Sequence, residues 1–225
     1  MNPLRRYLLH FESQIEAAAR RFSQSLPAGS RVLDAGAGES QYAHLFTNHQ
    51  YLAIDLAIGD PRWNYRKLDA IADLALLPLA SASCDAAINI VTLEHVREPA
   101  AVLREIARVL KPGATLLLIV PHEWEVHQEP NDYYRYTRHG VRYLLEAAGF
   151  SDIEIQPVGG FFRLLSRRLL NALQFFPGPL YVLAALVFAP PALLLPLLDP
   201  FDKKKNFTLG YIATARSPGG RSHLF

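Results

Sequence analysis

Three acidic residues in the first third of the chain follow apolar runs, at spacings that could bind one charged nucleoside. Asp34 ends the run Arg31–Asp34 and is followed closely by Gly36 and Gly38. A carboxylate here is a poor neighbour for a pyrophosphate, because both groups are negatively charged. It suits a ligand that presents an ammonium group to it while backbone N–H groups bind a carboxylate. An amino-acid moiety carries both of these charges.

The second and third acids extend this pattern towards a nucleoside. Asp55 closes the next apolar run, about 20 residues further on, where a carboxylate can accept hydrogen bonds from two ribose hydroxyls. Asp69 follows the third expected strand, where it could meet an adenine amino group. Ammonium, ribose and adenine in this order describe S-adenosylmethionine (SAM). The dinucleotide pattern G-x-G-x-x-G fits less well, since Gln41 stands at its third glycine, which disfavours a nicotinamide-dependent oxidoreductase.

Candidate groups for chemistry on an acceptor gather in one segment, "PHEWEVHQEPNDYYRYTRHG" at Pro121–Gly140. His127 or His122 could accept the proton of an acceptor hydroxyl. Aromatic rings could wall an acceptor pocket, and a guanidinium could hold an anionic group. These substrate-binding candidates are Trp124, Tyr133, Tyr134 and Arg135. A purely local role is the alternative, with Asp132 paired to Arg135. The spacing of the histidines and glutamates matches no metal template, so no metal site is predicted.

Alternating strand and helix patterns must position these residues. The expected strands are Arg31–Asp34, Tyr51–Asp55, Asn64–Leu68, Asp85–Val91, Ala114–Val120, Ile153–Val158 and Thr208–Ala215. The expected helices are an opening helix before Pro27, then Gln41–Phe46, Pro99–Leu110 and Arg138–Ala148. The pattern predicts an α/β fold: a Rossmann-like, seven-stranded, mostly parallel sheet with helices on both faces. Ligands of such sheets bind beyond the carboxyl ends of the strands.

One apolar stretch interrupts this pattern before the last strand. Residues 169–198 contain no charged side chain, but five prolines are expected to cut the stretch into short helical pieces. Basic residues flank both ends, which is unusual for a single membrane crossing. Three interpretations stay open: a hairpin lying in one leaflet of a membrane, a cap over the active site or a homodimer face, and a transmembrane helix.

Five motifs in chain order resemble the class I SAM-dependent methyltransferases of the type-11 group. They are Asp34-Ala-Gly36-Ala-Gly38, Asp55, Asp69, "SCDAAINIVTLEHV" at Ser83–Val96 and "REIARVLKPGATLLLIVP" at Arg104–Pro121. The resemblance covers about Val32–Ala215 and leaves the apolar stretch unexplained. This chain departs from the family at Ser40, where a third glycine is common.

The resemblance implies a role for each matching residue. In this family the first loop, here with Asp34, Gly36 and Gly38, cradles the methionine moiety of SAM. The acid after the second strand, Asp55, binds the ribose, and the acid after the third, Asp69, binds the adenine amine. A residue at the position of Asn89 lines the same pocket.

Composition sets the remaining expectations. The chain has 225 residues, a net charge of +2 and a single cysteine, Cys84, so an internal disulfide is excluded and a reducing compartment is favoured. The charge is too small to indicate a nucleic-acid partner. We expect a helical segment at 1–28, a SAM-binding core at 29–160, an apolar helical insertion at 161–206, and the last strand with a tail at 207–225. The expected location is the cytoplasm, with the inner face of a membrane as the alternative that the apolar stretch raises.

The predicted function is methyl transfer from SAM to a small-molecule or lipid-linked acceptor, at oxygen. The alternative is a SAM-binding, methyltransferase-like interaction module without turnover, because intact cofactor residues do not establish catalysis. The expected partners are the acceptor, a membrane surface contacted through 169–198, and a second copy of the chain. No nucleic-acid partner is expected.

Overall fold

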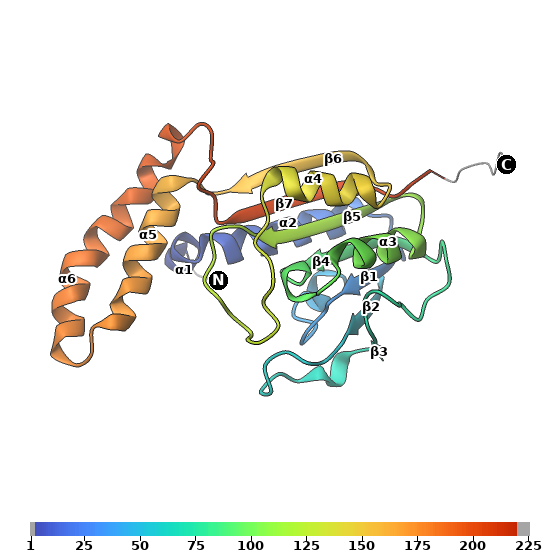
Figure 1. Cartoon of the computed structure of the whole chain (residues 1–225), viewed down its shortest axis with the longest axis horizontal. Helices are drawn as coiled ribbons and strands as arrows, with labels where there is room; N and C mark the ends of the chain where they lie inside the picture. The colour runs from blue at the N-terminus through green and yellow to red at the C-terminus, as the bar shows by residue number, and fades with distance from the viewer. Residues whose placement is uncertain (1–2, 220–225) are drawn as a thin grey trace.

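A seven-stranded sheet forms the centre of the protein in a computed structural model that describes residues 3–219 (Figure 1). Residues 1–2 of the expected segment 1–28, and residues 220–225 of the expected segment 207–225, lie outside the described residues. The strands are β1 (Arg31–Ala35), β2 (Gln50–Asp55), β3 (Ala70–Ile71), β4 (Cys84–Ile90), β5 (Leu110–Pro121), β6 (Ser151–Val158) and β7 (Gly210–Arg216).

The order of the strands creates the place for a ligand. The sheet runs β3-β2-β1-β4-β5-β7-β6. Strands β1 to β5 are parallel, and β7 is antiparallel to both β5 and β6. The chain builds outward from β1 to β3 and then returns to place β4 on the other side of β1. The connections therefore leave in opposite directions at β1 and β4, where a crevice opens beyond the strand ends.

Helices cover both faces of the sheet, as predicted. The helices of the described chain are α1 (Pro3–Leu8), α2 (His10–Ser25), α3 (Pro99–Val109), α4 (Arg138–Ala147), α5 (Phe161–Ala172) and α6 (Pro179–Leu194), of which α2 covers one face and α3 and α4 cover the other. Alternate strand residues face opposite ways, so β1 contributes Val32 to one core and Leu33 to the other. The first core takes the apolar side of α2, and the second takes α3 and α4.

Two expected elements are wrong. The helix expected at Gln41–Phe46 is only a 3-10 turn, η1 (Ala43–Leu45). The strand expected at Asn64–Leu68 is a second 3-10 turn, η2 (Tyr65–Lys67), because the Asn64 side chain accepts a hydrogen bond from the Arg66 N–H at 3.1 Å and favours a turn. The third strand comes later, as the two residues of β3. Three further 3-10 segments are η3 (Leu93–His95), η4 (Leu173–Phe175) and η5 (Leu195–Phe201).

The apolar insertion forms a helical hairpin of α5 and α6 that extends away from the sheet (Figure 1). The expectation that prolines cut it into short pieces is wrong for Pro190 and Pro191, which lie inside α6. Packing against α5 supports the helix here, since the Ser166 hydroxyl donates to the buried Ala192 carbonyl at 2.5 Å.

Two carboxylates close the base of this hairpin. The N–H groups of Gly160 and Phe161, at the start of α5, donate to Asp199 at 3.0 Å and to Asp202 at 2.8 Å. Negative charge at a helix N-terminus is favourable, because the first N–H groups have no partner within the helix. The two ends of the insertion are therefore fixed to each other and to the core.

Candidate cofactor and acceptor site

A cavity of about 390 Å³ lies beyond the carboxyl ends of β1, β2 and β4. Asp34, Gly36 and Asp55 line it, as do His95 and His127. This volume is within the range of small-molecule sites. The structure thus brings together most of the predicted cofactor residues with one of the two predicted catalytic histidines.

The glycine loop turns tightly because the chain passes close above the end of β4. Gly36 has φ +92°, and a Cβ added there would lie 2.1 Å from Cγ2 of Thr92. The Thr92 hydroxyl donates to the Gly36 carbonyl at 3.1 Å. At Ser40, where the resemblance led us to expect glycine, φ is +58°, so the serine adopts the left-handed conformation that glycine favours. The turn is therefore retained despite the substitution.

Asp34 presents a buried carboxyl group to the cavity. It is 1% exposed, and it accepts a hydrogen bond from the Tyr51 hydroxyl. Burial raises the pKa of Asp34 to about 7, since the charged form loses its hydration, and the Tyr51 hydrogen bond opposes this shift. A cationic group beside Asp34 would stabilise the carboxylate.

Asp55 joins the second strand to the glycine loop. Its Oδ2 accepts the Gly38 N–H at 2.9 Å, and its Oδ1 accepts the Ala57 N–H at 2.8 Å. Each carboxylate oxygen can accept more than one hydrogen bond, and Asp55 lines the cavity. Two hydroxyl groups of a ligand could therefore still bind it.

Asp69 does not take the position expected for the adenine-binding acid. Its carboxylate accepts the Ala53 N–H of β2 at 2.8 Å, whereas Asp73 lines the cavity. The reason is the register of the third strand, because β3 follows Asp69 and precedes Asp73. The acid at the carboxyl end of the real strand is Asp73, and a correct prediction of β3 could have found it. Nearby, the apolar residues Leu56, Ile58 and Leu74 also line the cavity.

Asn89 also differs from its expected place in the pocket. It is fully buried, and its amide donates to the Ala35 carbonyl at 2.7 Å, so it ties β4 to β1 beneath the glycine loop. The cavity wall is made instead by the next three residues, 90–92. A missed wall residue is Trp63, whose ring would lie 3.2 Å from a Cβ at Gly38.

The loop after β5 divides its predicted residues between two roles. Trp124 and His127 line the cavity. Arg135 instead organises the loop: it donates to both Asp132 oxygens at 2.6 and 2.7 Å, and to the Glu125 carbonyl at 2.7 Å. The local alternative considered for this pair is thus what the structure shows.

The other three candidates of this loop lie away from the cavity wall. Tyr133 donates to Asn131 Oδ1 at 3.0 Å, and Tyr134 donates to the Arg97 carbonyl at 2.9 Å. His122 contacts the Tyr136 carbonyl through Nδ1 at 2.8 Å and lines a separate depression beside Tyr211. His122, Tyr133, Tyr134 and Arg135, expected to face the reacting groups, are thus not among the residues that line the cavity.

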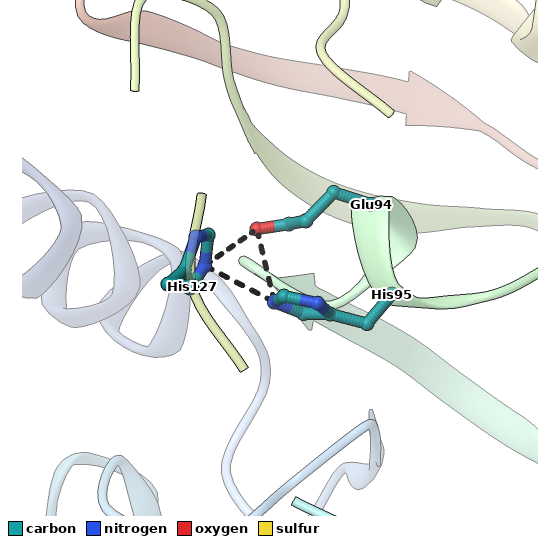
Figure 2. Close-up of side chains that lie close together, drawn as sticks. All are labelled: Glu94, His95 and His127. Atoms are coloured by element: carbon teal, nitrogen blue, oxygen red, sulfur yellow. Dashed lines mark hydrogen bonds and ion pairs between the residues drawn. The ribbon is translucent and has the colours of Figure 1, made fainter. Parts of the chain in front are cut away.

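His95 and His127 line the cavity, and the buried side chain of Glu94 lies next to both, a cluster that the sequence did not indicate. Figure 2 shows the three side chains pointing toward one another from η3 and from the loop after β5. The two Nε2 atoms are 3.1 Å apart, and Glu94 Oε1 lies 3.7 Å from that of His95 and 3.9 Å from that of His127. Burial raises the pKa of Glu94 to about 8 and lowers that of His95.

This strand order, with a glycine turn after β1 and acids at the ends of β1 and β2 and after β3, agrees with the Rossmann-like fold expected from the sequence motifs. Residues 33–118 match the family model described as a methyltransferase domain, and these residues belong to that family. The family identified from the sequence motifs is thereby confirmed, as are the predicted fold and the assignment to SAM-dependent proteins.

The chain is similar to two curated relatives and to one solved structure. A probable SAM-dependent methyltransferase of Mycobacterium tuberculosis is 36% identical over 97 residues, covering 40% of this chain and 35% of that protein. A tRNA (carboxymethyluridine(34)-5-O)-methyltransferase of Arabidopsis thaliana is 32% identical over 136 residues, covering 57% of this chain and 32% of the relative. These matches span about a third of each relative's length.

The fold likeness extends over nearly the whole chain. The putative methyltransferase in a complex with the Haloferax volcanii Trm112 methyltransferase activator superposes with a TM-score of 0.61 and 19% identity, covering 92% of this chain and 90% of the other. The likeness at this identity shows the fold.

Proposed function

We propose that this chain transfers a methyl group from SAM to an oxygen atom of a lipid-linked acceptor at a membrane surface. The observation that carries the methyl-transfer part is the single cavity wall shared by Asp34, Gly36 and Asp55 at one end and His95 and His127 at the other. The first three suit an aminoacyl nucleoside, and the last two suit a nucleophile that must lose a proton.

The residues present fit the cofactor in charge and shape. Asp34 would pair with the methionine ammonium, Asp55 would accept the ribose hydroxyls, and Asp73 would accept the adenine amine. An adenine ring needs apolar surface, and Leu56 and Ile58 are 43% and 56% exposed here although they line the cavity. When bound, SAM supplies an electrophilic methyl group on a sulfonium leaving group.

The protein's own contribution is alignment, exclusion of water and management of the acceptor's proton. Trp124 packs against Phe11 with ring centroids 5.1 Å apart, and the Arg167 guanidinium lies 3.7 Å from the centre of its indole ring. This stacking fixes an apolar wall beside His127. An oxygen nucleophile held at that wall would meet the histidine Nε2 atoms.

The lipid-linked acceptor is supported by the hairpin. Pro179–Phe201 is one 23-residue helical segment of mean hydropathy 2.2, long and apolar enough to cross a membrane, and 17% of its most apolar part is buried in the protein. Arg167 and Arg168 of α5 bind Glu125, next to Trp124. The apolar hairpin therefore lies next to the part of the cavity lined by Trp124 and His127. A membrane bound by the hairpin would be close to this part of the cavity.

The cofactor and turnover are tested together. Calorimetric titration should show binding of S-adenosylhomocysteine, and incubation with SAM and a membrane lipid extract should yield S-adenosylhomocysteine. A parallel incubation with bulk tRNA distinguishes the nucleic-acid acceptor. Binding without turnover on either pool would favour the interaction module, and turnover on tRNA alone would refute the lipid-linked acceptor.

Membrane contact is tested by flotation with anionic phospholipid vesicles. The double substitution Val182→Glu/Leu186→Glu changes two α6 residues that are 60% and 70% exposed, and it should abolish flotation. Tyr143→Glu, at an equally exposed apolar residue on α4, is the matched control and should leave flotation unchanged. Equal flotation of all three proteins would refute the role of the hairpin.

A further inference from the structure

Two imidazole nitrogens of the cavity wall and one buried carboxyl oxygen converge, and no hydrogen bond links the carboxyl group to either ring. The atoms are Nε2 of His95, Nε2 of His127 and Oε1 of Glu94, all within 4.8 Å of one another (Figure 2). They come from two segments, η3 and the loop after β5, that are about 30 residues apart in the chain. The question is what holds these atoms together.

The tautomer of His95 follows from its other nitrogen. Nδ1 lies 2.6 Å from the carbonyl oxygen of Asn131. A carbonyl oxygen can only accept, so Nδ1 carries the hydrogen. In the neutral ring Nε2 is then the atom with a free lone pair, and it points at His127.

His127 has the same tautomer. Its Nδ1 lies 3.1 Å from the Glu125 carbonyl oxygen and 3.4 Å from a terminal nitrogen of Arg135. That Arg135 nitrogen already donates its two hydrogens to the Glu125 carbonyl and to Asp132, each at 2.7 Å. Nδ1 of His127 is therefore the donor to Glu125, and the free lone pair of the ring is again on Nε2. Two lone pairs thus face each other across 3.1 Å.

Glu94 adds a third unsatisfied group. Its side chain is fully buried, and within residues 3–219 neither carboxylate oxygen has a hydrogen-bond partner. Buried carboxyl groups normally have a hydrogen-bond partner or bind a metal ion, since a buried polar group without a partner is costly. Arg135, the nearest guanidinium on the facing loop, is fully engaged with Asp132 and backbone carbonyls. A cation among the three atoms would satisfy all of them at once.

We propose that Glu94, His95 and His127 bind a divalent transition-metal ion of the Zn²⁺ class at the acceptor end of the cavity. Two imidazoles and one carboxylate are a ligand set typical of catalytic metal sites, in which further positions stay open for water or substrate. Tetrahedral bonds of about 2.0 Å separate neighbouring ligand atoms by about 3.3 Å. The observed 3.1, 3.7 and 3.9 Å need only small movements of the side chains.

The surroundings are those of a metal site. Both histidines donate Nδ1–H to a carbonyl oxygen, which orients each ring and leaves Nε2 for the ion. Asp132 lies 3.5 Å from His127 Nδ1 and accepts the His127 N–H at 2.8 Å, so a second carboxylate supports the cluster from outside. The Asp132–Arg135 pair thereby stabilises the loop that positions His127.

The open positions of the ion would face the cavity, which His95 and His127 both line. A hydroxyl oxygen bound to a Zn²⁺-class ion loses its proton near neutral pH. The use of the ion to activate the acceptor rests on the proposed function, whereas the site itself does not. Methyl transfer to such an oxygen would break the sulfur–methyl bond, form the oxygen–methyl bond, and release the hydroxyl proton to solvent.

The test is a Zn²⁺ titration of the untagged protein, stripped with a chelator, against a chromophoric competitor. One equivalent of Zn²⁺ should bind. Glu94→Gln, His95→Asn and His127→Asn should each weaken binding by at least the ~10–100-fold that loss of an outer-sphere partner costs. Co²⁺ should report the same site by visible absorption bands that are lost in the His127→Asn variant.

His44→Asn is the matched control, because His44 is exposed and lies on η1, away from the cluster. It should bind Zn²⁺ like the wild type. Thermal unfolding of each variant without metal separates loss of the site from loss of the fold, and the Glu94→Gln protein keeps the shape of the buried side chain.

Two outcomes overturn the metal site: no Zn²⁺ or Co²⁺ bound by the wild type, which would mean that the two imidazoles share a proton, or equal binding by the wild type and the three folded variants. Methyl transfer that is unaffected by chelator, in a protein that binds no Zn²⁺, would leave the proposed function intact. Conversely, stoichiometric Zn²⁺ binding in a protein with no S-adenosylhomocysteine binding would preserve the site and refute the proposed function.

Discussion

Gly36→Ala tests the close approach of the glycine loop to the end of β4. The added methyl group would lie 2.1 Å from Thr92 Cγ2, 2.5 Å from its Oγ1 and 2.7 Å from its Cβ. Thr92 is poorly placed to move, because its hydroxyl donates to the carbonyls of Gly36 and Ile90, each at 3.1 Å. The substitution therefore strains the backbone at position 36 and also displaces Thr92 from the cavity wall.

The cost has two parts of similar size. An alanine held at φ +92° costs about 1–3 kcal/mol in backbone strain. Forcing Thr92 aside in a packed region costs about 1–3 kcal/mol more. Gly36→Ala should therefore lower the free energy of unfolding by about 2–6 kcal/mol. The fraction that stays folded should bind S-adenosylhomocysteine at least ~10-fold more weakly, since 1.4 kcal/mol corresponds to a factor of ten.

Gly29→Ala supplies the control that separates these parts. Gly29 has φ +79°, close to that of Gly36, but no atom lies within 4 Å of an added Cβ. Urea unfolding should show that the free energy of unfolding of this variant falls only by the backbone strain of about 1–3 kcal/mol. Calorimetry should show unchanged binding of S-adenosylhomocysteine. Equal destabilisation by the two substitutions would refute the contact with Thr92.

Three further predictions concern polar side chains in and beside the sheet. Because burial raises the pKa of Asp34 to about 7, the folded protein retains a proton that the unfolded chain releases near pH ~4. Stability should fall as the pH rises from about 4 to 7, by up to ~1.4 kcal/mol per unit, and urea unfolding of Asp34→Asn should lack this contribution. Asp73→Asn should weaken S-adenosylhomocysteine binding by about 2–10-fold with little loss of stability. Asp69→Ala should do the reverse and lower stability by about 1–3 kcal/mol through the orphaned Ala53 N–H, so a larger effect of Asp69 on affinity would refute the reassignment. Asn89→Ala should lower the free energy of unfolding by a similar amount and leave the Kd for S-adenosylhomocysteine unchanged, which a comparison of unfolding and titration curves would reveal.

Local physical constraints explain why several elements could be predicted from the sequence. The β1 turn was predictable because Asp34, Gly36 and Gly38 combine an apolar run with residues suited to tight turns. The helix α3 was bounded nearly correctly, since Pro99 fits a first helical turn and Pro112 and Gly113 cannot continue a helix. These features depend on a few neighbouring residues, so the sequence carries them directly.

The third strand and its acid could not be predicted in the same way. A two-residue strand has too little periodicity to detect, and β3 exists because β2 offers it hydrogen-bonding partners. The error in that strand led the sequence analysis to Asp69, whereas the acid that lines the cavity after β3 is Asp73. The acid was identified by its place relative to a strand, and pairing between distant segments decides where that strand lies.

The sequence by itself determined the family, the alternating α/β pattern and the acids at the ends of β1 and β2, because short runs of neighbouring residues carry each of these signals. The tertiary structure decided which polar residues of the later loop face the cavity. Arg135 forms an ion pair with Asp132, and His122 lines a separate depression. His127 lies beside His95 and Glu94. Such convergence depends on the folding of β4 and β5 side by side, which no local spacing in the chain records.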